Sequence, residues 1–152
     1  MPQIIVINYG SQVAHLINRR IRELGVFSEL VPYGITAKDI RKISPKGIIL
    51  SGGPASVYEE GAPQIDKDIL EIGIPILGVC YGLQLIGKNY GKVIPGKIKE
   101  YGKKYLAVKN NGKLLKGLGK KEQIWMSHGD LVKKLPEDFR ILAKTDNCPI
   151  AA

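Results

Sequence analysis

Short apolar runs alternate with amphipathic stretches along the first half of the chain. Runs of apolar and β-branched residues predict strands over residues 4–7, 26–31, 47–50 and 75–79. Apolar residues at helical spacing predict helices over residues 11–24, 37–43 and 64–72, and a fourth from just after Cys80 through 83–89. Ser11 and Thr36 are expected to cap the first two helices, and Gly25 is expected to end the first. This alternation predicts right-handed β-α-β units and an open, mostly parallel sheet with helices on both faces.

The pattern changes after Gly91, where shorter β-like pieces replace the alternation of strands and helices. These pieces cover residues 92–94, 104–108, 123–126 and 139–143, and turns such as Asn111-Gly112 join them. We expect antiparallel strands added to the edge of the parallel sheet. The sequence shows no internal repeat or linker, so one α/β domain is predicted over residues 1–152.

Composition fits a folded domain, with 44% hydrophobic and 24% charged residues. No apolar run approaches the roughly 20 residues that cross a bilayer, so no membrane association is expected. The N-terminus leads directly into the first predicted strand, without the basic and apolar regions of a signal peptide. A cytoplasmic protein is the simplest interpretation.

The net charge of +9 is concentrated in one segment. Residues 88–121 contain eleven lysines and a single acid, Glu100, which gives the segment a charge of 11 − 1 = +10. Because the cations are lysines with few interleaved aromatic residues, we interpret the segment as a solvated edge and expect no nucleic-acid partner. Contact with an acidic partner domain remains an alternative.

The most specific chemical pattern is Gly78-Val79-Cys80-Tyr81-Gly82. It follows an apolar strand and opens a helix, the context of a nucleophile elbow. Such a turn lifts the thiol above the carboxyl end of the sheet, and the helix N-terminus favours the thiolate. The alternative is a structural cysteine. The other cysteine, Cys148, lies far along the chain, so we expect no disulfide, and no Cys/His cluster has the spacing of a metal site.

Acyl transfer also needs donors for the oxyanion. The N–H of Tyr81 is one natural donor, and a second can come from Gly52-Gly53 after the neighbouring strand. The segment 51–56, SGGPAS, resembles a phosphate loop only superficially, because Pro54 lacks an N–H and Ala55 replaces the carboxylate.

Together these residues resemble a known family. The segments SGGPASVYEEGAP (51–63), GVCYGLQL (78–85), EYG (100–102), WMSHGD (125–130) and NCPIAA (147–152) occur in this order in class I (triad) glutamine amidotransferases, which have a flavodoxin-like α/β fold. The last three segments, and NYGSQ (8–12), are similar to the glutaminase domain of GMP synthetases.

The resemblance implies hydrolysis of glutamine through a γ-glutamyl thioester on Cys80, with the oxyanion held by the N–H groups of Gly53 and Tyr81. It places the glutamine-binding residues at Gly52, Gly53 and Gln84 and in a loop that consists of Ser127, His128, Gly129 and Asp130. It implies no cofactor and no metal in this domain. Ammonia then passes to an ATP-pyrophosphatase domain or subunit, which uses ATP and magnesium to convert XMP to GMP.

The family's His-Pro-Glu motif does not occur in this sequence, which ends at Ala152. The resemblance therefore implies that the general base and its carboxylate are absent, and a truncated chain is the expected explanation. His128, with Asp130 nearby, is a chemical alternative as base, whereas His15 is expected to be a packing or surface residue. We predict no useful glutamine turnover by these residues alone. The alternatives are an amidotransferase of another pathway and a non-catalytic module that binds a synthetase subunit.

Overall fold

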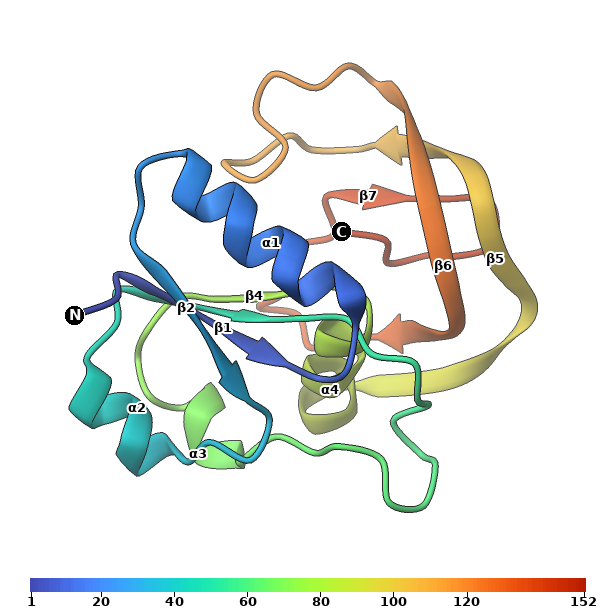
Figure 1. Cartoon of the computed structure of the whole chain (residues 1–152). Helices are drawn as coiled ribbons and strands as arrows, with labels where there is room; N and C mark the ends of the chain where they lie inside the picture. Colours follow the sequence, from blue (N-terminus) through green and yellow to red (C-terminus); the bar gives the residue numbers. More distant parts are fainter. The chain divides into compact units, whose positions relative to one another are not determined.

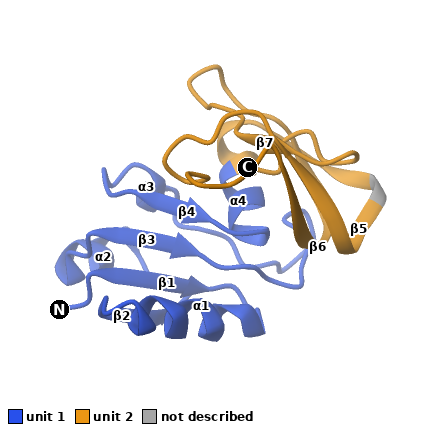
Figure 2. Ribbon diagram, turned by 90° about the horizontal axis from the view of Figure 1, so that it is seen from above, with its two compact units in different colours: residues 1–86 blue, residues 87–152 orange. Residues whose placement is uncertain are grey.

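The structure of the chain is a computed structural model that describes residues 1–96 and 99–152. The chain divides into two compact units, Met1–Ile86 and Gly87–Ala152, here unit 1 and unit 2 (Figure 2). No helix among the described residues is long and apolar enough to cross a membrane.

Unit 1 contains a four-stranded parallel sheet in the order β2-β1-β3-β4. Its strands are β1 (Ile4–Asn8), β2 (Ser28–Pro32), β3 (Gly47–Leu50) and β4 (Ile76–Gly78). The connecting helices are α1 (Gln12–Glu23), α2 (Ala37–Ile43) and α3 (Lys67–Leu70), and α4 (Tyr81–Tyr90) follows β4. Helix α1 covers one face of the sheet and α2 and α3 the other, as right-handed connections require when the chain reverses direction across the sheet (Figure 1).

The apolar pattern of the strands explains the core of unit 1. Ile5, Val6 and Ile7 are fully buried in the central strand β1, so both faces of this strand are covered. Ile48 and Leu50 of β3 extend the same core. The core extends to the carboxyl edge of the sheet, where β3 and β4 pass into the segments that carry the predicted site.

Local interactions set the ends of the elements. Ser11 and Thr36 cap α1 and α2 as predicted, each accepting a hydrogen bond from a first-turn N–H. The N–H of Val26 donates to the Ile21 carbonyl at the end of α1, so β2 begins at Ser28, later than the predicted 26. Helix α3 is shorter than the predicted 64–72, because Asp66 is its extended N-cap and also accepts from the N–H of Ala37.

Unit 2 contains a separate antiparallel sheet in the order β6-β5-β7. Its strands are β5 (Lys92–Val108), β6 (Lys121–Lys134) and β7 (Ala143–Lys144). Antiparallel strands after Gly91 were expected, but in the described residues they form a sheet of their own and do not extend the parallel one. The predicted pieces 92–94 and 104–108 belong to one strand, β5. The strand predicted over residues 139–143 is wrong except at Ala143, because β7 consists of Ala143 and Lys144, which pair with Val108 and Ala107 of β5.

Strand β5 carries part of the lysine-rich segment and pairs with β6 in unit 2. Tyr101 and Tyr105 of β5 and Trp125 of β6 are exposed. The ammonium groups of Lys103 and Lys121 lie 5.6 and 4.4 Å from the centre of the Tyr105 ring. The pairing of β5 with β6 therefore interleaves lysines with aromatic rings, which the linear sequence does not show.

Candidate active site

A strained turn joins β4 to α4 and carries Cys80. Cys80 has a φ of 50°, in the left-handed region that residues with a side chain rarely adopt, and α4 begins at the next residue. Hydrogen bonds from the N–H of Val79 to the Leu50 carbonyl and from the N–H of Gly82 to the Ser51 carbonyl, 2.9 and 3.0 Å long, hold the turn against β3. The predicted strand–turn–helix context of Cys80 is thus confirmed, and the residue is exposed.

The two glycines of the elbow are required by close backbone contacts. A Cβ added at Gly78 would lie 2.7 Å from the backbone nitrogen of Leu83. One added at Gly82 would collide with the carbonyl oxygen of Leu50 and lie 2.5 Å from its Cβ. A side chain at Gly78 would push α4 away from β4, and one at Gly82 would push α4 away from β3. The sequence Gly-x-Cys-x-Gly therefore allows the turn to pack.

The segment after β3 lies beside the elbow. A Cβ at Gly52 would be 3.6 Å from the Cβ of Cys80, and one at Gly53 would be 2.6 Å from the Tyr9 carbonyl oxygen. The buried hydroxyl of Ser51 accepts from the N–H of Tyr9 at 3.0 Å and donates to the Gly52 carbonyl at 2.9 Å. The structure therefore brings Gly52 close to Cys80 and fixes the backbone of this segment.

Two backbone donors remain available near the thiol. Among the described residues, neither the N–H of Gly53 nor that of Tyr81 donates a hydrogen bond to the protein. The Tyr81 side chain is anchored separately, because its hydroxyl donates to the Pro63 carbonyl at 2.6 Å and its ring packs 5.6 Å from that of Tyr9. Paired, rigid and unoccupied N–H groups are what an oxyanion hole needs.

The pKa of the Cys80 thiol is shifted in the direction opposite to the expectation. Desolvation by the surrounding protein raises the pKa of the thiol, although the residue keeps contact with solvent. The helix N-terminus was expected to lower this pKa. In the part of the chain that the structure describes, no hydrogen bond or ion pair reaches the sulfur, so an additional base is needed to generate the thiolate at neutral pH.

Gln84, a predicted substrate residue, lies one turn into α4. It is 8% exposed, and its N–H donates to the Cys80 carbonyl at 3.0 Å. Its position on the helix that starts at the nucleophile follows directly from the spacing Cys-x-x-x-Gln.

The other predicted substrate residues, Ser127, His128, Gly129 and Asp130, belong to unit 2. They were expected in a loop, but they lie within β6, where Asp130 pairs with Pro95, His128 with Glu100 and Ser127 with Tyr101. The imidazole of His128 is engaged inside unit 2: Nδ1 contacts the Asp130 carbonyl at 2.9 Å and Nε2 contacts Glu100 at 3.1 Å. This ring is therefore occupied, which argues against His128 as the missing base. His15 is exposed on α1, as expected of a surface residue.

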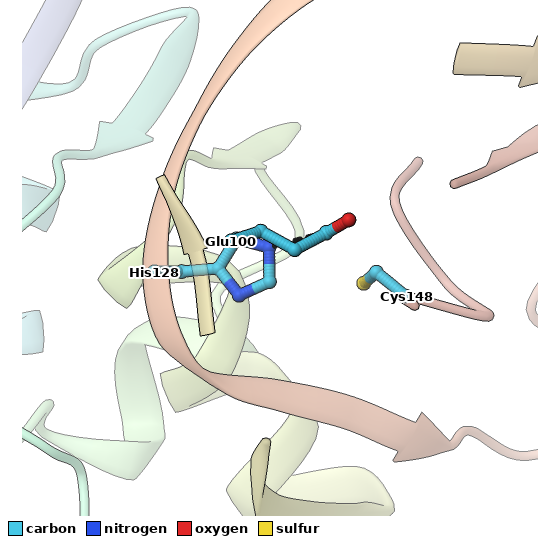
Figure 3. Close-up of side chains that lie close together, drawn as sticks. All are labelled: Glu100, His128 and Cys148. Carbon is cyan, nitrogen blue, oxygen red and sulfur yellow. Dashed lines mark hydrogen bonds and ion pairs between the residues drawn. The ribbon is translucent and has the colours of Figure 1, made fainter. Parts of the chain in front are cut away.

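Sequence reasoning missed a buried polar cluster around Glu100. The carboxylate is completely buried and accepts from the Thr145 hydroxyl at 2.9 Å and from His128. Carboxylate, imidazole and the Cys148 sulfur all lie within 4.8 Å of one another (Figure 3). Burial raises the pKa of the Cys148 thiol, and Glu100 raises it further. Glu100, His128 and Cys148 each lie in a segment that resembles the family, at 100–102, 125–130 and 147–152. No sequence spacing brings them together, because Glu100 is 28 residues from His128 and 45 from Thr145.

Comparisons with known proteins show the family to which the sequence is similar. The profile of the family described as glutamine amidotransferase class-I matches residues 5–152. A GMP synthase [glutamine-hydrolyzing] of Ligilactobacillus salivarius is 54% identical over 99% of this chain. The chain spans only 30% of the length of that relative.

Solved structures share the fold. A protein from Thermoplasma acidophilum, described as a subunit of a GMP synthase, has a TM-score of 0.84 and 31% identity, covering 99% of this chain and 76% of its own. A glutamine amidotransferase from Thermotoga maritima has a TM-score of 0.74 at 19% identity, covering 95% of this chain and 67% of its own, and this likeness concerns the fold. On the profile match, the elbow and the fold together, this chain belongs to the class-I glutamine amidotransferase family.

Proposed function

We propose that this chain is the glutaminase part of a GMP-synthesising enzyme and that Cys80 attacks the side-chain amide of glutamine. The attack forms a γ-glutamyl thioester and releases ammonia, and water then releases glutamate. The observation that carries this proposal is the strained elbow, where an exposed Cys80 lies beside two backbone N–H groups without protein partners.

The remaining roles follow from the resemblance and from the relatives' names. Gly53 and Tyr81 are the proposed oxyanion donors, and Gly52 and Gln84 the proposed contacts to glutamine from unit 1. The resemblance also assigns Ser127, His128, Gly129 and Asp130 to glutamine binding. Because the His128 ring is bound to Glu100 and Asp130, its role is in holding the backbone of this stretch.

The ammonia is proposed to pass to an ATP-pyrophosphatase domain or subunit that converts XMP to GMP with ATP and magnesium. The naming of the 54% identical relative as a GMP synthase supports this partner over that of another amidotransferase pathway. Glutaminase chemistry itself requires no cofactor, since nucleophile and oxyanion donors are protein groups. Purine nucleotide synthesis also fits a cytoplasmic location.

The proposal is tested by labelling the chain with 6-diazo-5-oxo-L-norleucine, an electrophilic analogue of glutamine, followed by intact mass and peptide mapping. Cys148 serves as an internal comparison, because it is a free but buried thiol. We expect single labelling at Cys80, protection by excess L-glutamine, and no protection by D-glutamine.

Two reagents, the glutamine analogue and iodoacetamide, distinguish glutamine binding from the general reactivity of the Cys80 thiol. Gly53→Ala places a Cβ against the Tyr9 carbonyl and should slow labelling by the glutamine analogue, while iodoacetamide still reaches Cys80. Labelling of Cys80 no faster than Cys148, with no effect of glutamine, would refute the glutaminase proposal. It would favour a module that binds a synthetase without catalysis.

A further inference from the structure

We propose that Glu100, His128 and Cys148 form a binding site for one divalent metal ion of the zinc type within unit 2. The site is independent of the elbow, and its test does not rely on glutaminase activity. Figure 3 shows how the three side chains converge from β5, β6 and the segment after β7.

The donor set and its spacing suit zinc. Carboxylate oxygen, imidazole nitrogen and thiolate sulfur are all zinc ligands, at about 2.0 Å for oxygen and nitrogen and about 2.3 Å for sulfur. In a tetrahedral site such atoms lie roughly 3.3–3.5 Å apart. Oε2 of Glu100 and Nε2 of His128 are already 3.1 Å apart, and the Cys148 sulfur is within 4.8 Å of both. A side-chain adjustment of about 1 Å completes the geometry.

The outer contacts orient all three groups. Nδ1 of His128 faces the Asp130 carbonyl at 2.9 Å, so it carries a proton and directs Nε2 inward. Thr145 donates to the Glu100 carboxylate and accepts from the N–H of Cys148 at 3.0 Å. A histidine that donates its second nitrogen to a carbonyl, and a carboxylate that is itself hydrogen-bonded, are the usual supports of metal ligands.

The burial of the cluster favours a ligand that engages all three groups. Glu100 is fully buried and His128 is 10% exposed, and Oε2 of Glu100 lies 3.1 Å from Nε2 of His128. A proton between these two atoms satisfies the imidazole and the carboxylate. A proton engages only two of the groups, and the Cys148 thiol then donates to the Ile150 carbonyl at 3.4 Å. A metal ion engages all three.

The test titrates the purified, metal-stripped chain with Co²⁺, which reports its ligands by absorption. We expect saturation at one equivalent, tetrahedral visible bands and a thiolate-to-cobalt charge-transfer band that Zn²⁺ removes. Cys148→Ser should abolish the charge-transfer band, and the matched Cys80→Ser should retain it. Thr145→Val, which removes an outer contact, should weaken binding by about 10–100-fold.

A second measurement uses only the wild-type chain, so it does not depend on whether the variants fold. Nitrogen-15 spectra of the two histidine rings of the wild-type chain report the state of His128. Binding should leave Nε2 unprotonated and shifted while Nδ1 keeps its proton. No stoichiometric binding, with a proton persisting between His128 and Glu100, would overturn the proposal in favour of a buried ion pair. A cobalt band lost only in Cys80→Ser would overturn it too.

Discussion

Substitution of Gly82 by alanine tests the packing that holds the elbow. The new Cβ would lie 2.5 Å from the Cβ of Leu50 and closer still to the Leu50 carbonyl oxygen. Carbon atoms pack at about 3.5–4.0 Å, so the start of α4 must move away from β3 by about 1 Å. Leu50 is fully buried in β3, and backbone forms part of the contact, so no side-chain rotation relieves it.

The expected cost follows from two opposing effects. Overpacking costs about 1–3 kcal/mol, while replacing a helical glycine by alanine gains about 0.8–1.0 kcal/mol. We therefore expect Gly82→Ala to lower the free energy of unfolding by up to about 2 kcal/mol. The reaction of Cys80 should suffer more, since a misplacement of about 1 Å can reduce the rate about 100-fold.

Urea unfolding and the rate of labelling by the glutamine analogue measure the two effects. Gly34→Ala is the matched control, because a Cβ there meets nothing within 4 Å and φ is not left-handed. Its unfolding free energy should stay within about 0.5 kcal/mol of wild type, with an unchanged labelling rate. If Gly82→Ala behaves like Gly34→Ala in both assays, close packing of α4 on β3 does not position Cys80.

Three further predictions concern other groups. Alkylation of Cys80 by iodoacetamide should reach half its maximal rate at a higher pH than alkylation of cysteine in an unfolded peptide, because desolvation raises the pKa of the thiol. A midpoint below that of the peptide contradicts the argument. Thr145→Val should lower the free energy of unfolding by about 1–3 kcal/mol, because the buried Glu100 loses a donor. Thr145→Ser keeps the hydroxyl and should retain most of this free energy. Equal urea midpoints for both variants would exclude this role of the hydroxyl. Ser51→Ala should cost about 1–3 kcal/mol by leaving the N–H of Tyr9 without its acceptor, and hydrogen exchange at that amide should accelerate; unchanged protection would count against it.

The elbow could be predicted because its determinants are local. An apolar strand, a glycine on each side of the nucleophile and a helical pattern occur within a few residues, and each maps directly onto β4, Cys80 and α4. The position of Gly52 beside Cys80 was also predictable, since neighbouring parallel strands end at the same edge. The direction of the Cys80 pKa shift could not be predicted from the sequence, because it depends on how closely other segments surround the sulfur.

The second half was harder to predict because its pairing is not local. Pro95 and Gly102 interrupt the strand pattern, yet they pair with Asp130 and Met126, so tertiary pairing overrides the local preference. The stretch 127–130 has the Ser, His, Gly and Asp composition of a loop but continues β6 for the same reason. The Glu100 cluster was also missed because its members come from three separate segments. Their separations along the sequence match no known motif.

The separations within that cluster have a consequence for how unit 2 folds. Closing loops of 28 and 45 residues costs conformational entropy before the buried carboxylate of Glu100 gains its partners. A half-formed sheet would hold this charge away from water with too few donors, which is costlier than leaving it solvated. Formation of the cluster is therefore cooperative. We expect β5, β6 and the segment after β7 to become stable together, because an arrangement that lacks one of them leaves Glu100 buried with too few donors.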